Sequence, residues 1–158
     1  MGTHSTTTNG GTMNTKLDVK QWGIASLAVF VILTIFTFIL IRLGVEPWAI
    51  PAPQGENVAV PDAMTGRIVT YLSRLITAAL FTFIFTKTIV EKPGMGHGIR
   101  YGLGIGLLIF VPNYIYGLVY WNLSTAAQTI FMVVGVIEFV VCGAMIAQLY
   151  KPGKPAAA

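Results

Sequence analysis

Three polar side chains lie deep within long apolar runs of this sequence: Glu138, Arg74 and Asn113. An ionised carboxylate in lipid is costly, and such residues commonly mark ion or proton pathways. Glu138 lies about thirteen residues into its run, roughly 10 Å from the cytoplasmic face. Two interpretations follow. Glu138 is either the titrating group of a transporter, or a neutral or paired carboxyl that hydrogen-bonds neighbouring helices.

Arg74 is the candidate counter-ion of Glu138. Helix rise places Arg74 roughly 10 Å from the opposite face and Glu138 roughly another 10 Å deeper, a separation greater than most direct pairs span. The same count places Asn113 at nearly the same depth as Arg74. We therefore expect Arg74 to pair with Asn113 and the carbonyl freed by Pro112, rather than with Glu138. Alternatively, Arg67 and Arg74, which share one side of a helix, both snorkel outward to the headgroups.

Other constellations typical of active sites are missing from the sequence. It contains no phosphate loop, HExxH motif, nucleophile elbow or paired catalytic carboxylates. The single cysteine, Cys142, excludes an intramolecular disulfide and a cysteine-based zinc site within the chain. His4 lies in the N-terminal tail and His97 in a predicted turn, so neither suits haem ligation inside a bundle. We expect no enzyme activity, no metal and no cofactor.

The elements that must position these side chains are helices in lipid. Of the 158 residues, 54% are hydrophobic and 10% are charged, whereas a soluble domain has about a quarter of its residues charged. The sequence predicts an all-α, integral membrane four-helix bundle as one domain over residues 22–150. Its spans are expected at about 22–43, 67–88, 98–121 and 126–150. Residues 1–21 and 151–158 are expected to be tails, and 44–66 a periplasmic loop.

Charge placement predicts the topology of the four spans. The loop 44–66 contains three acids and no Lys or Arg. Because positive charge marks the cytoplasmic side, we expect an up-down-up-down course with both termini in the cytoplasm. The net charge of +4 therefore indicates topology and not nucleic-acid binding. Seven of the ten basic residues are expected on the cytoplasmic side: Lys16, Lys20, Lys87, Lys92, Arg100, Lys151 and Lys154.

A glycine stripe distinguishes the third predicted span. Gly98, Gly102 and Gly106 recur every fourth residue, and Pro112 interrupts the run near its far end. A helix side without side chains lets another backbone approach closely, as helices in lipid often do. The segment GMGHGIRYGLGIGLL, with its G-x-R-Y-G-L pattern, resembles a group of small bacterial four-helix inner-membrane proteins. The resemblance implies a bacterial, multi-pass inner-membrane protein and carries over no functional residue.

These observations favour a non-catalytic integral membrane subunit that packs against and stabilises a larger inner-membrane complex. Its expected partners are membrane lipids and other integral membrane subunits. The alternative is a small oligomeric transporter or channel that uses Glu138 as its titrating group. An enzyme acting on a lipid or quinone is the least favoured hypothesis.

Overall fold

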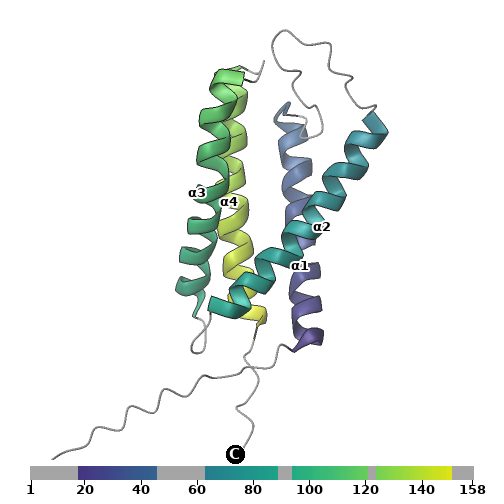
Figure 1. The fold of residues 1–158 in the computed structure, drawn as a ribbon, viewed down its shortest axis with the longest axis vertical. Helices are drawn as coiled ribbons and strands as arrows, with labels where there is room; N and C mark the ends of the chain where they lie inside the picture. The colour runs from purple at the N-terminus through teal and green to yellow at the C-terminus, as the bar shows by residue number, and fades with distance from the viewer. Residues whose placement is uncertain (1–17, 46–62, 89–93, 121–123, 151–158) are drawn as a thin grey trace, which may run out of the picture.

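The computed structural model describes residues 18–45, 63–88, 94–120 and 124–150, and these ranges form four α-helices (Figure 1). The helices are α1 (Val19–Arg42), α2 (Ala63–Thr88), α3 (Met95–Tyr120) and α4 (Thr125–Leu149). Each is long and apolar enough to cross a membrane. The described part of the chain is therefore all-α and has the character of a multi-pass membrane protein.

All four helices begin earlier than the apolar runs indicate, by one to four residues, and in α1 and α4 a polar residue outside the run supplies the cap. Helix α1 begins at Val19 and not at Trp22, since the Asp18 side chain accepts hydrogen bonds from the main-chain N–H groups of Lys20 (3.1 Å) and Gln21 (3.2 Å). Likewise, the Ser124 side chain accepts from the N–H of Ala127 at 3.2 Å and starts α4. Such caps satisfy donors that have no partner within the helix.

Helices α3 and α4 form a closely packed antiparallel pair. Gly98 lies against Gly143 and Ala147, Gly102 against the main chain of Phe139 and Val140, and Gly106 against Val136. As the residue numbers of the glycines increase along α3, the residue numbers of their contacts on α4 decrease, so the two helices run in opposite directions. The glycine stripe therefore packs on the fourth helix of the same chain.

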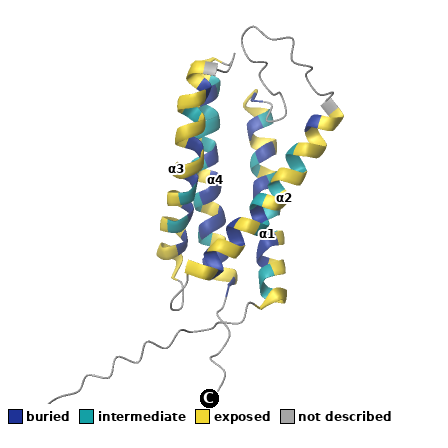
Figure 2. Ribbon diagram, in the orientation of Figure 1, coloured by how far each residue is buried: buried dark blue, intermediate teal, exposed yellow. Residues whose placement is uncertain are grey.

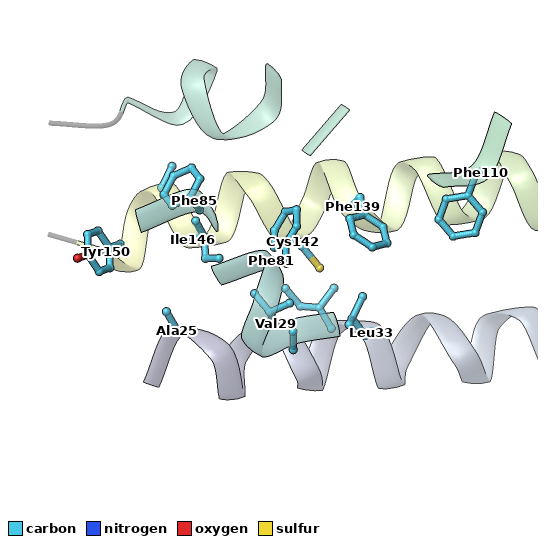
Figure 3. Close-up of a cluster of buried hydrophobic side chains, with 13 residues drawn as sticks. Ala25, Val29, Leu33, Phe81, Phe85, Phe110, Phe139, Cys142, Ile146 and Tyr150 are labelled. Carbon is cyan, nitrogen blue, oxygen red and sulfur yellow. The ribbon is translucent and has the colours of Figure 1, made fainter. Parts of the chain in front are cut away.

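The second helix crosses the others at a steep angle (Figure 1). Aromatic contacts hold its C-terminal half: the Phe81 ring lies 4.8 Å from that of Tyr101 on α3 and 5.2 Å from that of Phe139 on α4. The Tyr101 hydroxyl also donates to the main-chain oxygen of Phe81 at 2.8 Å. Phe81 and Phe139 belong to the core drawn in Figure 3, which also includes Val29 and Leu33 of α1, and Tyr101 packs against this core. Helix α1 packs against both α2 and α4.

The outward sides of the helices are exposed and mainly apolar (Figure 2). Ile68 and Leu72 of α2, for example, are more than half exposed, as are Leu108 and Ile115 of α3. Helices cross a bilayer when their outer surface suits hydrocarbon and their backbone polar groups are satisfied internally. This pattern fits a bundle whose solvent is lipid.

Candidate intramembrane polar site

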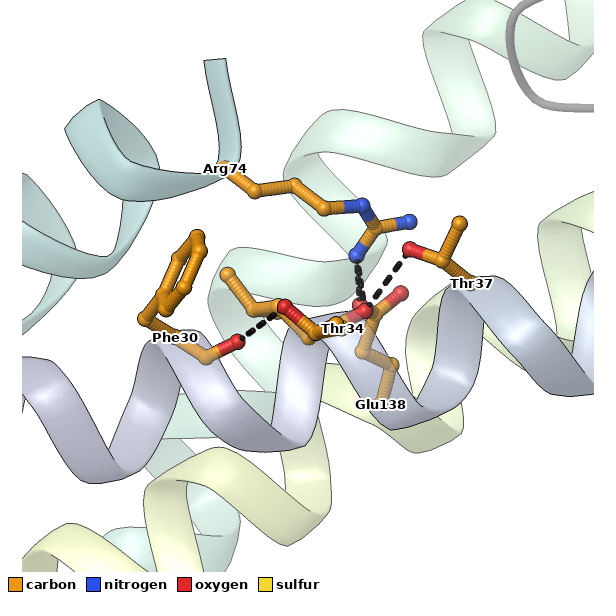
Figure 4. Close-up of polar contacts among 6 residues, drawn as sticks. Phe30, Thr34, Thr37, Arg74 and Glu138 are labelled. Carbon is orange, nitrogen blue, oxygen red and sulfur yellow. Dashed lines mark hydrogen bonds and ion pairs between the residues drawn. The ribbon is translucent and has the colours of Figure 1, made fainter. Parts of the chain in front are cut away.

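Glu138 lies near the middle of α4, and its side chain is only 3% exposed. It points away from the α3 contact, toward the side where α1 and α2 cross (Figure 4). A carboxylate in this position has lost its water, so its charge must be balanced by the protein.

Arg74 of α2 supplies that balance. Its Nη1 donates to Oε1 of Glu138 and also to the main-chain oxygen of Leu33, 2.6 Å away on α1 (Figure 4). One guanidinium nitrogen thus connects α1, α2 and α4. Because the Arg74 side chain is only 14% exposed, the ion pair is largely shielded from the surroundings.

The expected pairing of Arg74 with Asn113 was wrong. The depth argument treated the helices as parallel rods, whereas α2 is tilted against the other helices (Figure 1). Arg74 instead contacts Glu138, near the middle of α4. The long arginine side chain covers the remaining distance. The snorkelling alternative is also wrong for Arg74, whose guanidinium turns inward. Arg67, one of the two residues of that alternative, has an exposed side chain.

Asn113 and Pro112 lie on an exposed part of α3. The α3–α4 contact follows every fourth residue, through Gly102, Gly106 and then Phe110, whose ring lies against Gly135. Each step of four residues turns about 40° round the helix axis. The contact therefore passes to the Tyr114 side of α3 before it reaches the level of Asn113, and Asn113 stays outside.

Main-chain and hydroxyl groups complete the site in a way that residue patterns did not indicate. The oxygen of Leu33 also accepts from the Thr37 hydroxyl at 2.9 Å, and Thr37 is fully buried. One turn earlier, the Thr34 hydroxyl donates to the oxygen of Phe30 at 2.8 Å. Every residue has a main-chain oxygen, so only the position of α1 against Arg74 could identify Leu33 as an acceptor. Two threonines three residues apart on one apolar span were the available signal.

The remaining candidates do not join this site. Among the described residues, no group of three or more His, Cys, Asp or Glu side chains could hold a metal ion. His97 lies in the first turn of α3 and not in a connecting turn, with its ring 6.0 Å from that of Phe85. Cys142 is a buried free thiol within the core cluster. The arrangement can neutralise two charges in the membrane interior and hold three helices together.

No protein-family model, curated protein or solved structure matches this chain.

Proposed function

We propose that this chain is a non-catalytic integral membrane subunit that packs against and stabilises a larger protein assembly in a bacterial inner membrane. The interior polar groups described above bond to other helices of the same chain: Arg74 to Glu138 and Leu33, and Tyr101 to Phe81. Gln128 likewise donates to the oxygen of Gly117 at 3.0 Å. Hydrogen bonds of this kind hold the helices together, which favours a structural role over a pathway for ions.

One observation carries the proposal: Asn113 is exposed on a helix that is long and apolar enough to cross a membrane. It lies seven residues from Tyr120, which is about 10 Å along the helix axis. Acyl chains offer no hydrogen bonds, so an amide at that depth is satisfied best by another protein segment. The glycine stripe, which first indicated association, packs within the chain. The outer face of α3 that carries Asn113 is accordingly the surface proposed for a partner.

The assembly should depend on this amide. We expect the wild-type protein, extracted in mild detergent, to migrate as a complex larger than one chain of 17.0 kDa with its detergent. Asn113→Leu should shift most of it to the single-chain position, because the replacement removes the hydrogen bonds and keeps an apolar surface. Native mass spectrometry gives the masses directly.

Val111→Ala is the matched control, since Val111 is 37% exposed and two residues at 100° each place it about 160° round the helix from Asn113. It should leave the complex intact. A wild-type protein that migrates alone as a single chain refutes the proposed function.

The proposal includes an up-down-up-down course with both termini in the cytoplasm. It is supported by the antiparallel contacts of α3 with α4 and by the basic residues that flank the expected cytoplasmic ends. In intact spheroplasts, Glu56→Cys should react with an impermeant maleimide, and Lys154→Cys should react only after permeabilisation. The native thiol of Cys142 is buried and gives little background. Equal reaction of the two variants before permeabilisation contradicts this topology.

A further inference from the structure

The exposed face of α3 next to Asn113 combines one polar side chain with apolar neighbours. Ile109 lies one turn before Asn113 on the same side of the helix and is 37% exposed, and Pro112 beside it is exposed as well. In Figure 1, the corresponding half of α2 leans away from α3. This face, made of Ile109, Pro112 and Asn113, is called the Asn113 face below.

The Asn113 face presents both kinds of hydrogen-bonding group. The carboxamide of Asn113 has two donors and an acceptor oxygen. Pro112 has no N–H, so the main-chain oxygen of Leu108 lacks the donor it would otherwise receive four residues later. The exposed surface of α3 next to Pro112 therefore carries a main-chain acceptor in addition to the Asn113 carboxamide.

We infer that a second copy of this chain covers the Asn113 face, with the two α3 helices related by a two-fold axis. This inference rests on the proposed function and names the partner. Around a two-fold axis each residue meets the same surface of the other copy, so a contact must be self-complementary. A carboxamide meets that condition because it donates to and accepts from its own kind.

Charge does not oppose this contact. After Arg100 there is no charged residue in α3, so two copies meet without like-charge repulsion over the apolar part of the span. Asn113 lies thirteen residues after Arg100, about 20 Å along the helix. A different membrane protein would need its own polar group at the same depth to replace the second amide, whereas a second copy brings one by symmetry.

Crosslinking from Ile109, with Asn113 left in place, tests the inference. Full-length Ile109→Cys, expressed with two different tags and oxidised in native membranes, should give a disulfide-linked species at twice 17.0 kDa that carries both tags. Adding Asn113→Leu should lower its yield about tenfold, in keeping with loss of interhelical hydrogen bonds. Asn113→Gln should retain the species, because glutamine keeps the carboxamide.

Val111→Cys serves as the matched position, since Val111 is 37% exposed, as Ile109 is, and two residues at 100° each place it about 160° round the helix from Asn113. Comparable crosslinking from Val111 and Ile109 would indicate random collision and overturn the inference. If Ile109→Cys gives no linked species while the native complex still depends on Asn113, a second copy does not cover the Asn113 face. That result refutes this inference and leaves the proposed function standing. If the wild-type chain also migrates alone, both proposals fail.

Discussion

Glu138→Ala should destabilise the protein by about 3–5 kcal/mol, the usual result of removing one partner of a buried ion pair. The change leaves the Arg74 guanidinium without its carboxylate, and arginine cannot lose its proton to become neutral. Arg74 also bonds to the Leu33 oxygen on α1, so its departure toward the headgroups would break the polar bonds of α2 to both α1 and α4. Titration of the purified protein with SDS in mixed micelles, followed by tryptophan fluorescence, measures the loss.

A comparison of the stability lost when each partner is removed is the sharper test of this site. Arg74→Ala should cost less than Glu138→Ala, because a carboxyl left alone can take up a proton and remain buried as a neutral acid. The double variant Arg74→Leu with Glu138→Leu should recover most of the stability, since matched apolar replacement of a buried pair is often neutral or favourable. A double variant as unstable as Glu138→Ala would contradict a mainly structural pair. A proton flux in proteoliposomes that is abolished by Glu138→Gln would also contradict a mainly structural pair, and it would favour the transporter hypothesis.

Much of the fold follows from one-dimensional features of the sequence. The apolar runs identified the four helices because a span needs about 20 apolar residues and little else. The four-residue spacing of Gly98, Gly102 and Gly106 identified a close helix contact, because residues four apart lie on the same side of a helix. Spacing alone, however, does not say which helix fills the contact, and only the structure assigns it to α4.

The site was harder to predict because it depends on angles between helices. Depths counted along each chain separated Arg74 from Glu138, and the tilt of α2 removes that separation. Asn113 was expected to pair with Arg74, whereas the contact with α4 turns round α3 and leaves Asn113 outside. Both errors come from treating crossed helices as parallel. Residue types were enough to single out all three polar side chains, and their partners required the crossing geometry.

The same crossing geometry makes Gly102→Leu the second large effect. A Cβ at position 102 would overlap the main-chain oxygen of Phe139, and a main chain in a helix cannot move aside as a flexible side chain does. Helices α3 and α4 must therefore separate, which also weakens the bond from Tyr101 to the Phe81 oxygen on α2. We expect a loss of about 3 kcal/mol or more, at the upper end of costs for overpacking.

Gly104→Leu is the control for that loss, because it makes the same replacement two residues away, on the opposite side of α3. A Cβ there meets nothing within 4 Å. Leucine favours the helical conformation over glycine by roughly 0.5–1 kcal/mol, so this variant should match or exceed the wild-type protein in the same SDS titration. The two variants should thus change stability in opposite directions. Equal behaviour would mean that the close contact between α3 and α4 does not hold the bundle together, and the positions assigned to Glu138 and Asn113 would lose their basis.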